Sequence, residues 1–350
     1  MTDAPLAGSS RPTPNPPPLP PAVHRTRKLV RATIEEALDR LHPDIARACR
    51  YYKGWCELDG TPNEAWGSRG LEASLVFLCA QAAGGDPEAA VPAAAALELM
   101  HEATMLHDDI VDEDALRRKR PTVWAALGTP TALLAGNALW AGANELLLAV
   151  PPPMGQQLAR VCNEFIARIL HGGASGQSLG HRAAHEISME EYLAICRDNC
   201  ALLGCAVELG VLMGGGTRKQ AAPLREAAEQ AGIGWQATND LEDLWGDAAL
   251  VGKAGYNDLR QRKKTLPILA ALRSNTPAGK QLATFLSHET LTEDDLSTMA
   301  GLTAEAGGRS YAEEVARASL VRAQEALETA GVPEPTRTAI GAILRFVITR

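Results

Sequence analysis

The sequence lacks an apolar stretch long enough to cross a membrane, because no run of about 18 uninterrupted apolar residues occurs. The nearest candidate, residues 130–150, is interrupted by Asn137, Asn144 and Glu145. The N-terminus also lacks the charged region and apolar run that define a signal peptide. We therefore expect a cytoplasmic protein without a membrane span.

Basic residues are fewer than acidic ones, since 34 Lys and Arg stand against 42 Asp and Glu and give a net charge of -8. Such a chain would not be held to a polyanion by general electrostatics, so a nucleic-acid partner is not expected. A local basic cluster could still bind a phosphate. The seven cysteines show no paired metal-ligand spacing, and we interpret them as reduced core residues.

The first 23 residues hold eight prolines and cannot pack into a core. Polyproline II structure or disorder is the physical expectation for such a segment. A docking segment for a protein partner is the alternative interpretation. We assign residues 1–23 to a disordered Pro-rich tail and residues 24–350 to one folded domain.

Helical spacing of apolar residues recurs along this domain, and strand-like alternation is absent. With 46% hydrophobic but only 4% aromatic residues, the composition suits an Ala- and Leu-rich helical core. The pattern predicts an all-α bundle with short Gly/Pro loops. The predicted helices cover residues 25–52 with a break at Pro43, 71–83, the segment from Pro92 through the first aspartates, 131–148, 156–169, 189–212, 223–244, 264–272, 278–286, 311–330 and 335–347.

Three aspartates interrupt the apolar helix that begins near Pro92. Asp108 and Asp112 are four residues apart and lie on one helix face, with Asp109 beside them. Carboxylates massed on an apolar helix repel one another and are costly to bury unless a hard cation lies among them. The motif therefore predicts a divalent metal site.

A second acidic patch lies in the segment GIGWQATNDLEDLWGD. Its Asn239, Asp243 and Asp247 are spaced by four residues and form one stripe, with Asp240 beside it. Two acidic helices facing each other can hold Mg²⁺ ions through one or two carboxylates each, together with phosphate oxygens. Cations that could neutralise a diphosphate leaving group follow this patch, namely Lys253, Arg260, Arg262, Lys263 and Lys264. Such a site suits ionisation of an allylic diphosphate.

The two motifs together resemble those of the trans-isoprenyl diphosphate synthases, or polyprenyl synthetases, of the class I isoprenoid synthase superfamily. HDDIVDEDALRR is similar to the first aspartate-rich motif, and GWQATNDLEDLWGD with GKAGYNDLRQRKKTLPILAAL is similar to the second motif and its lysine segment. The resemblance extends from about residue 67 to the C-terminus. It implies a large single-domain helical bundle with a central cavity, Mg²⁺ as cofactor, and a homodimer formed through the central helices.

The resemblance also implies roles for individual residues. Metal ligands or their close support would be Asp108, Asp109, Asp112, Asp240 and Asp243. The allylic diphosphate would be held by Arg117, Lys253 and Lys263. The site for isopentenyl diphosphate would include Arg118, His101 and Arg69, and Gln236 would also contact substrate.

Two substrate sites depart from the family pattern. The segment GSRGLEA keeps Arg69, but Gly70 and Glu72 stand where the family has arginines that hold isopentenyl diphosphate. Charge-assisted hydrogen bonds contribute roughly 1.5 to 3 kcal/mol each, so binding there should be weakened by several kcal/mol. Asp198 stands where the family has a lysine, which would affect the allylic diphosphate or the emerging cation.

Small residues precede the first motif at the place where family members that make short products carry a bulky aromatic. Here Ala103 and Thr104 occupy that place. We therefore predict a prenyl chain of fifteen carbons or longer.

Three functions remain open at this stage. The first is a prenyltransferase that couples an allylic diphosphate to isopentenyl diphosphate or to a non-standard acceptor. The second is a class I terpene cyclase, because Asn239, Asp243 and Asp247 have the spacing of the metal triad of those enzymes. The third is a non-catalytic subunit of a heteromeric synthase, although such a subunit would be expected to lose the first aspartate motif, which this chain keeps.

Overall fold

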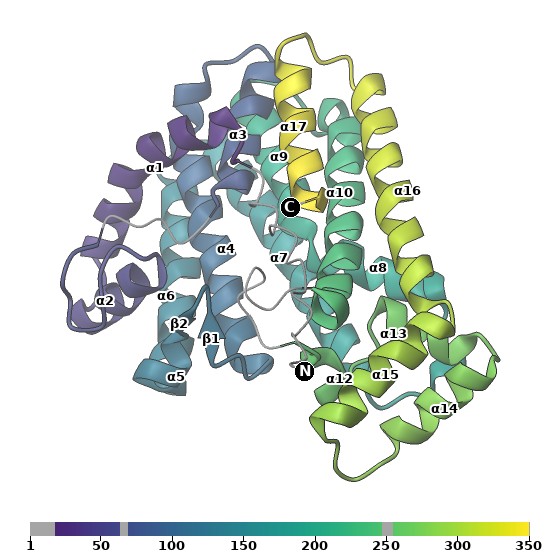
Figure 1. The fold of residues 1–350 in the computed structure, drawn as a ribbon. Coiled ribbons are helices and arrows are strands. Elements are labelled where there is room, and N and C mark those ends of the chain that lie inside the picture. Colours follow the sequence, from purple (N-terminus) through teal and green to yellow (C-terminus); the bar gives the residue numbers. More distant parts are fainter. Residues whose placement is uncertain (1–17, 64–68, 247–254, 350) are drawn as a thin grey trace, which may run out of the picture.

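Helices make up nearly all of the computed structural model, which describes residues 18–63, 69–246 and 255–349 (Figure 1). The N-terminal half contains α1 (Pro21–Asp39), α2 (Pro43–Tyr52), α3 (Leu71–Ala82), η1 (Pro87–Ala90), α4 (Val91–Val111), β1 (Leu116–Arg117), β2 (Arg120–Pro121), α5 (Val123–Leu127), α6 (Thr129–Leu148) and α7 (Met154–Leu179). The C-terminal half contains η2 (Ala184–Glu186), α8 (Met189–Asn199), α9 (Ala201–Met213), α10 (Arg218–Trp245), α12 (Asn257–Arg260), α13 (Leu266–Arg273), α14 (Pro277–Leu286), α15 (Glu293–Glu305), α16 (Gly308–Thr329) and α17 (Thr336–Thr349).

The main core lies between α3, α4, α9 and α10, and small residues let these helices approach closely. Ala93–Ala96 of α4 are fully buried, so α4 is packed on nearly every side. A Cβ on Gly210 of α9 would lie 2.4 Å from the carbonyl oxygen of Val76 in α3, which only a glycine permits. The alanine-rich composition therefore produces a tightly packed centre that holds α4 rigidly.

A second, smaller core joins α12 to α15 in the lower right of Figure 1. Leu259, Ile268, Leu282 and Met299 are buried in it, and Leu244 near the end of α10 packs against them. This small core fixes the segment that follows the second acidic patch, and so determines where Lys263 lies.

The predicted all-α architecture is confirmed, with corrections in detail. The predicted helix 189–212 is divided at Cys200 into α8 and α9, whereas α7 runs further than predicted, to Leu179. The helix α15 was not predicted. A two-residue hairpin, in which Arg117 pairs with Arg120, contradicts the prediction that strands are absent.

The boundary placed at residue 23 falls inside a helix. The helix α1 begins at Pro21, a favoured residue for a first turn, and Val23 is fully buried. The folded domain therefore starts a few residues earlier than predicted, and residues 1–17 of the Pro-rich tail lie outside the described residues.

Two expectations about composition can be compared with the structure. Within the described ranges, no helix combines the length and apolar character that a membrane crossing requires. All seven cysteines are free and buried, as predicted for reduced core residues.

Candidate active site

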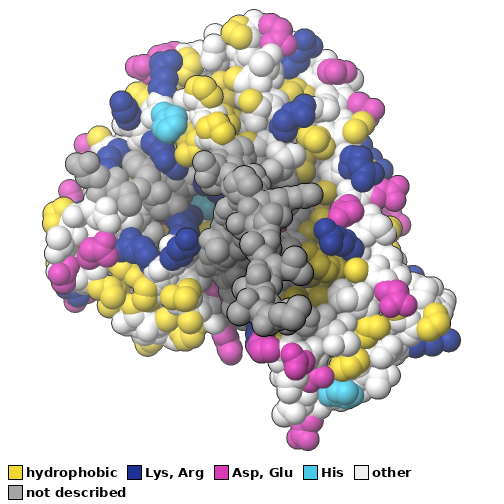
Figure 2. Space-filling model, in the orientation of Figure 1, with side chains coloured by type: hydrophobic (Ala, Val, Ile, Leu, Met, Phe, Trp, Pro, Cys, Tyr) yellow, Lys and Arg dark blue, Asp and Glu magenta, His cyan; other side chains and the backbone are white. Residues whose placement is uncertain are grey.

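The helix α4 has one partly accessible stripe. This stripe consists of His101, Thr104, Met105, Asp108 and Asp112, which are spaced so that they share a helix face. In the view of Figure 2, Lys and Arg side chains lie over the left part of the molecule, where Figure 1 places α1 and α2. The aspartates that the sequence predicted to face metal, Asp108 and Asp112, therefore do lie on one face.

Asp108 is exposed on this stripe, with Asp112 and Arg117 close enough to affect its charge. Burial and the neighbouring Asp112 raise the pKa of Asp108 to about 6, against the opposing effect of Arg117. Repulsion between the two carboxylates is what a divalent cation would relieve. Asp108 is thus poised to gain stabilisation from a bound cation.

Asp109 faces away from the accessible stripe. Its side chain is 1% exposed, and its Oδ1 accepts a hydrogen bond of 2.5 Å from Arg117 Nε. Arg117 also lies 3.6 Å from Asp114, so the short hairpin is fastened to the end of α4. Both predicted residues therefore lie on the side of α4 away from Asp108 and Asp112, where they support α4, and this placement argues against a direct metal bond from Asp109.

Further acidic residues of α4 are buried beside Asp109. Glu102 forms an ion pair with Lys53, and both side chains are 1% exposed. Lys53 and Arg31 each lie 4.6 Å from the centroid of the Trp55 ring. Burying a charged pair is costly unless its geometry is good, so this contact fixes the N-terminal helices against α4. Sequence reasoning missed Lys53, whose only signal was a lysine within an aromatic segment.

The second acidic patch is divided between a buried and a half-buried side of α10. Asp240 is 1% exposed and accepts hydrogen bonds from Gln236 Nε2 (2.7 Å), Tyr192 Oη (3.0 Å) and the backbone nitrogen of Leu266 (2.9 Å). Burial nevertheless raises the pKa of Asp240 to about 6. Asp240 thus anchors the start of α13, and Gln236 contacts Asp240, so neither shows the substrate or metal-facing placement that was predicted.

Asp243 lies one turn further along α10, next to a carboxylate that the sequence analysis did not single out. The backbone nitrogen of Asp258 donates to Asp243 Oδ2 over 2.9 Å. Burial, Asp243 and Asp240 raise the pKa of Asp258 well above its ordinary value. Asp243, Asp258 and the half-buried Asn239 therefore form the acidic wall opposite α4, while Asp247 lies outside the described residues.

Lys263 lies between the aspartates of α4 and those near the end of α10, since it pairs with Asp112 and is also influenced by Asp258. Its Nζ lies 2.8 Å from Asp112 Oδ1, and Gln261 Nε2 donates to the carbonyl oxygen of Asp112 over 2.7 Å. Other cations of the same run point elsewhere, since Lys264 Nζ donates to the carbonyl oxygens of Leu179 and Gly180 at the end of α7. The structure thus selects Lys263 from this run, and Lys253 lies outside the described residues.

The residues present fit Mg²⁺ as the ion of this cleft. Among the described residues, no three His, Cys, Asp or Glu side chains form a preformed cluster around one point. Mg²⁺ does not require such a cage, because it keeps several waters and is commonly held by one or two carboxylates together with substrate phosphates. Asp108 and Asp112 supply such a pair.

Basic residues lie on the other side of the accessible stripe. Arg118 occupies a left-handed backbone position (φ 54°) at the hairpin turn, and Arg69 lies 5.8 Å from the centroid of the Phe346 ring. His101 Nδ1 is 3.4 Å from a carboxylate oxygen of Glu72. His101 therefore contacts Glu72 on the α4 stripe, Arg118 lies in the hairpin that follows α4, and Arg69 lies beside α17.

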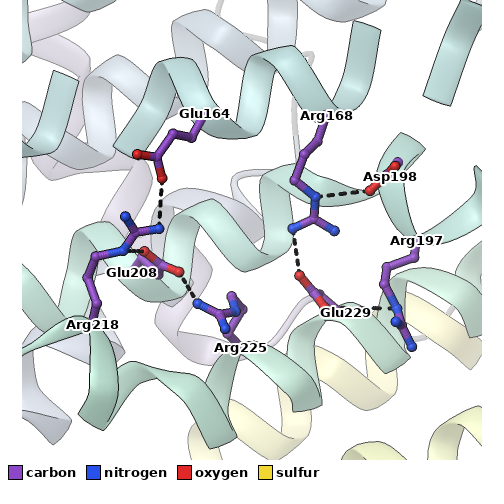
Figure 3. Close-up of polar contacts among 8 residues, drawn as sticks. All are labelled: Glu164, Arg168, Arg197, Asp198, Glu208, Arg218, Arg225 and Glu229. Atoms are coloured by element: carbon purple, nitrogen blue, oxygen red, sulfur yellow. Dashed lines mark hydrogen bonds and ion pairs between the residues drawn. The ribbon is translucent and has the colours of Figure 1, made fainter. Parts of the chain in front are cut away.

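Asp198 is not in this cleft. It lines a hollow of about 490 Å³ formed by α7, α8, α9 and α10, where Arg168 Nε lies 2.9 Å from Asp198 Oδ1 (Figure 3). The same hollow contains Arg197, Arg218 and Arg225 together with Glu164, Glu208 and Glu229. The sequence analysis expected Asp198 to lie beside the allylic diphosphate. This placement is wrong, because the carboxylate of Asp198 points toward Arg168 in the hollow.

The residues proposed to set product length are placed differently from one another. Ala103 has no exposed surface and faces the core. Thr104 is half-buried on the accessible stripe, and its hydroxyl donates to the carbonyl oxygen of His101. Of these two residues, only Thr104 has a side chain whose size could limit the space beside the accessible stripe of α4.

Comparison with known proteins agrees with this arrangement. Residues 66–302 match the family model described as polyprenyl synthetase. The chain is 31% identical to (2E,6E)-farnesyl diphosphate synthase of Mycobacterium tuberculosis, over 94% of this chain and 93% of that protein. It is also 31% identical to geranylgeranyl diphosphate synthase of M. tuberculosis, over 92% of each chain.

A solved structure supports the same relationship. The polyprenyl synthetase from Streptomyces coelicolor A3(2) superimposes with a TM-score of 0.85 at 34% identity, covering 94% of this chain and 99% of that one. The fold, the sequence match and the two facing acidic walls lead to one conclusion: the chain belongs to the polyprenyl synthetase family and is a prenyltransferase.

Proposed function

We propose that the protein is a Mg²⁺-dependent trans-prenyl diphosphate synthase that joins an allylic diphosphate to isopentenyl diphosphate. The observation that carries this proposal is the contact between Lys263 and Asp112, which brings the second acidic patch to the end of the first. The relatives named above support it, since both are named as synthases of prenyl diphosphates.

The residues of the cleft would divide the work by charge. Asp108 and Asp112 would hold Mg²⁺, which supplies the positive charge that stabilises a departing diphosphate. Lys263, held against Asp112, would place an ammonium group beside the same leaving group. The allylic carbon–oxygen bond then breaks, the double bond of isopentenyl diphosphate attacks that carbon, and a proton leaves the new chain.

The proposed acceptor would be held by two arginines outside the aspartate cluster. Arg69 and Arg118 would bind its diphosphate by charge-assisted hydrogen bonds. This placement keeps the two diphosphates apart, one beside the aspartates and one beside the arginines. A second basic site of this kind, together with relatives that are named as prenyl diphosphate synthases, supports a two-substrate reaction over cyclisation of a single substrate.

We also propose products of fifteen carbons or longer. Thr104 supports this because a small side chain lies on the accessible stripe one turn from Asp108. The prenyl chain would run along α4 past this position.

The expected homodimer finds support in exposed leucines on the central helices. Leu133, Leu134 and Leu148 of α6 and Leu170 of α7 are 44–58% exposed. Apolar groups gathered on two neighbouring helices are typical of an interface. Light scattering on the purified protein would give the mass of a dimer, and a monomer would contradict this part of the proposal.

The experiment that tests the function uses defined substrates. The protein is incubated with Mg²⁺ and allylic diphosphates of ten, fifteen or twenty carbons, with and without isopentenyl diphosphate, and products are identified by mass spectrometry. Elongated diphosphates formed only with isopentenyl diphosphate support the proposal. Hydrocarbons or alcohols formed equally well without it would instead indicate a terpene cyclase, and release of diphosphate without elongation would indicate another acceptor.

A further inference from the structure

The short helix α12 ends in a turn that passes through Arg262. The backbone nitrogen of Arg262 donates to the carbonyl oxygen of Leu259 over 3.0 Å, and that of Lys263 donates to the carbonyl oxygen of Asp258 over 2.8 Å. This pair of bonds is a Schellman ending, in which the left-handed position is usually a glycine. Here Arg262 occupies that position (φ 53°), although a residue with a Cβ adopts it at a cost. The chain therefore turns at an unfavourable residue, directly before Lys263.

Both ends of the segment that contains this turn are fastened to α10. The backbone nitrogen of Asp258 donates to Asp243 Oδ2 over 2.9 Å, and the backbone nitrogen of Leu266 donates to Asp240 Oδ2 over the same distance. Arg262 lies between these two attachments. Its backbone conformation therefore directs the residues next to it.

The side chain of Arg262 is held by the turn between α14 and α15. Its Nη2 donates to the carbonyl oxygen of His288 over 2.5 Å and to that of Glu289 over 3.1 Å. Hydrogen bonds from a charged donor are stronger than those between neutral groups, so these contacts offset the cost of the left-handed backbone. They also direct the guanidinium to the small core of α12–α15, away from the aspartates.

Both chain neighbours of Arg262 contact Asp112 at the end of α4. Gln261 Nε2 donates to the carbonyl oxygen of Asp112 over 2.7 Å, and Lys263 Nζ lies 2.8 Å from Asp112 Oδ1. A change of backbone conformation at Arg262 would therefore disturb both contacts, because the two side chains leave the turn on either side of it.

We propose that Arg262 is a positioning residue for Lys263. Its guanidinium, held by the α14–α15 turn, keeps the left-handed turn closed and so keeps the ammonium of Lys263 beside Asp112. This inference rests on the proposed function, because it takes Lys263 as the cation beside the departing diphosphate. Arg262 acts through Lys263 and does not itself contact the substrate.

A double-mutant cycle tests this role. In Arg262→Ala, kcat should fall roughly five- to thirtyfold, because displacing a catalytic group by about 1 Å can cost up to about a hundredfold. The KM for isopentenyl diphosphate should stay within about twofold. In a Lys263→Ala background, adding Arg262→Ala should change kcat by less than about twofold, because no ammonium is left to position. Arg262→Lys should recover part of the loss, since its ammonium can donate to the same carbonyl oxygens.

The matched control is Arg273→Ala. Arg273 lies in α13, and its Nη1 donates to the carbonyl oxygens of Ala184 (3.1 Å) and Ile187 (2.6 Å), so this variant loses the same kind of contact away from the lysine turn. Its kcat per folded molecule should stay within about twofold of the wild type. A loss of kcat equal to that of Arg262→Ala would overturn the proposal.

Arg262→Gly separates the backbone from the side chain. Its thermal midpoint should lie about 1–3 °C above that of Arg262→Ala, because glycine adopts the left-handed conformation freely. Its kcat should remain low, because the guanidinium contacts are missing. Wild-type kcat in Arg262→Gly would show that the guanidinium positions nothing.

Hydrogen exchange tests the turn without relying on the reaction. The backbone amide of Lys263 should exchange at least about fivefold faster in Arg262→Ala than in the wild type or Arg273→Ala, because its bond to Asp258 opens more often. Unchanged exchange would overturn the proposal, as would equal losses of kcat with and without Lys263. If Lys263→Ala alone keeps full turnover, the role of Lys263 in the proposed function is wrong, whereas faster exchange would still support the control of its position by Arg262.

Discussion

Two groups of arginines in this molecule differ in what neutralises them. In the hollow between α7 and α10, Arg168, Arg197, Arg218 and Arg225 each lie within 4.0 Å of a carboxylate, and Glu208 and Glu229 are each shared by two arginines (Figure 3). At the front, among the described residues, no ion pair within 4.0 Å is found for Arg69 or Arg118.

The difference indicates which group can bind a substrate. An arginine that already has a carboxylate partner must lose that contact before it binds an anion, whereas an arginine without an ion pair can bind an anion directly. The carboxylates and arginines of the hollow between α7 and α10 are therefore expected to contribute to stability, whereas the proposed chemistry lies beside Asp108 and Asp112.

The largest effect should come from removing Asp108. Asp108→Ala should lower kcat at least about a hundredfold, because a carboxylate that positions Mg²⁺ contributes several kcal/mol to stabilisation of the leaving group. Glu113→Gln, an exposed carboxylate change a few residues away, should leave turnover nearly unchanged. Steady-state kinetics with saturating Mg²⁺ measure both variants, and full activity of Asp108→Ala would show that the metal assignment is wrong.

The second prediction concerns stability in the rear hollow. Glu208 has no exposed surface and pairs with Arg218 and Arg225, so Arg218→Ala/Arg225→Ala should lower the free energy of unfolding by about 3 kcal/mol. Adding Glu208→Gln should restore much of that loss, because the uncompensated buried charge is removed. Denaturant titration measures stability, and kcat per folded molecule should be unchanged. A selective loss of substrate affinity would mean that the hollow belongs to the active site.

Product length should respond to Thr104 more than to Ala103. Thr104→Phe should shorten the main product by about one five-carbon unit, because the ring would fill the accessible stripe of α4. Thr104→Val is the matched control of similar size and should keep the wild-type product. Ala103→Phe would instead overfill a packed core, which typically costs about 1–3 kcal/mol of stability. Mass spectrometry of the products decides, and an unchanged product from Thr104→Phe would contradict this placement.

The smallest effect should be a dependence of metal-free stability on pH. The folded pKa of Asp108, about 6, lies above the ordinary value of 3.8, so the folded state holds this proton more firmly than the unfolded state does. The stabilising contribution is present below about pH 4 and is lost as the pH rises through about 6. With a chelator present, Asp108→Asn should therefore reduce the fall in thermal midpoint between pH 5 and pH 7.5, by about 1–2 °C because Asp108 is accessible to solvent.

Asp240 should leave a residual slope in the same experiment, since its pKa is also raised to about 6. Added Mg²⁺ should raise the thermal midpoint of the wild type at pH 7.5 and have little effect on Asp108→Asn. A slope identical in the two proteins would mean that Asp108 does not titrate as described.

Local spacing predicted the acidic part of the site well. Asp108 and Asp112 share a face because four residues make about one helical turn, and this required no knowledge of the fold. The same rule could not tell that Asp109 and Asp240 turn inward, because their direction is decided by Arg117 and Tyr192, which reach them from other elements.

Contacts between distant segments account for the rest of what the sequence could not reveal. Arg27 reaches Gly70 only after α1 packs on α3, and the break at Cys200 helps to direct Asp198 toward Arg168. Gly172 contributes to the second case, because a Cβ there would lie 3.0 Å from Asp198 Cβ and would separate α7 from α8. Such placements depend on packing that no local pattern encodes.

The buried ion pair of Lys53 and Glu102 means that substitutions in these two segments must change together. The residues are 49 positions apart in the chain, yet neither can change its charge without stranding the other in the interior. A hybrid that takes its first two helices from a relative would fold well only if position 53 arrived with a cation or position 102 changed with it. Exchange of the first two helices against α4 is therefore restricted to relatives that carry opposite charges at positions 53 and 102.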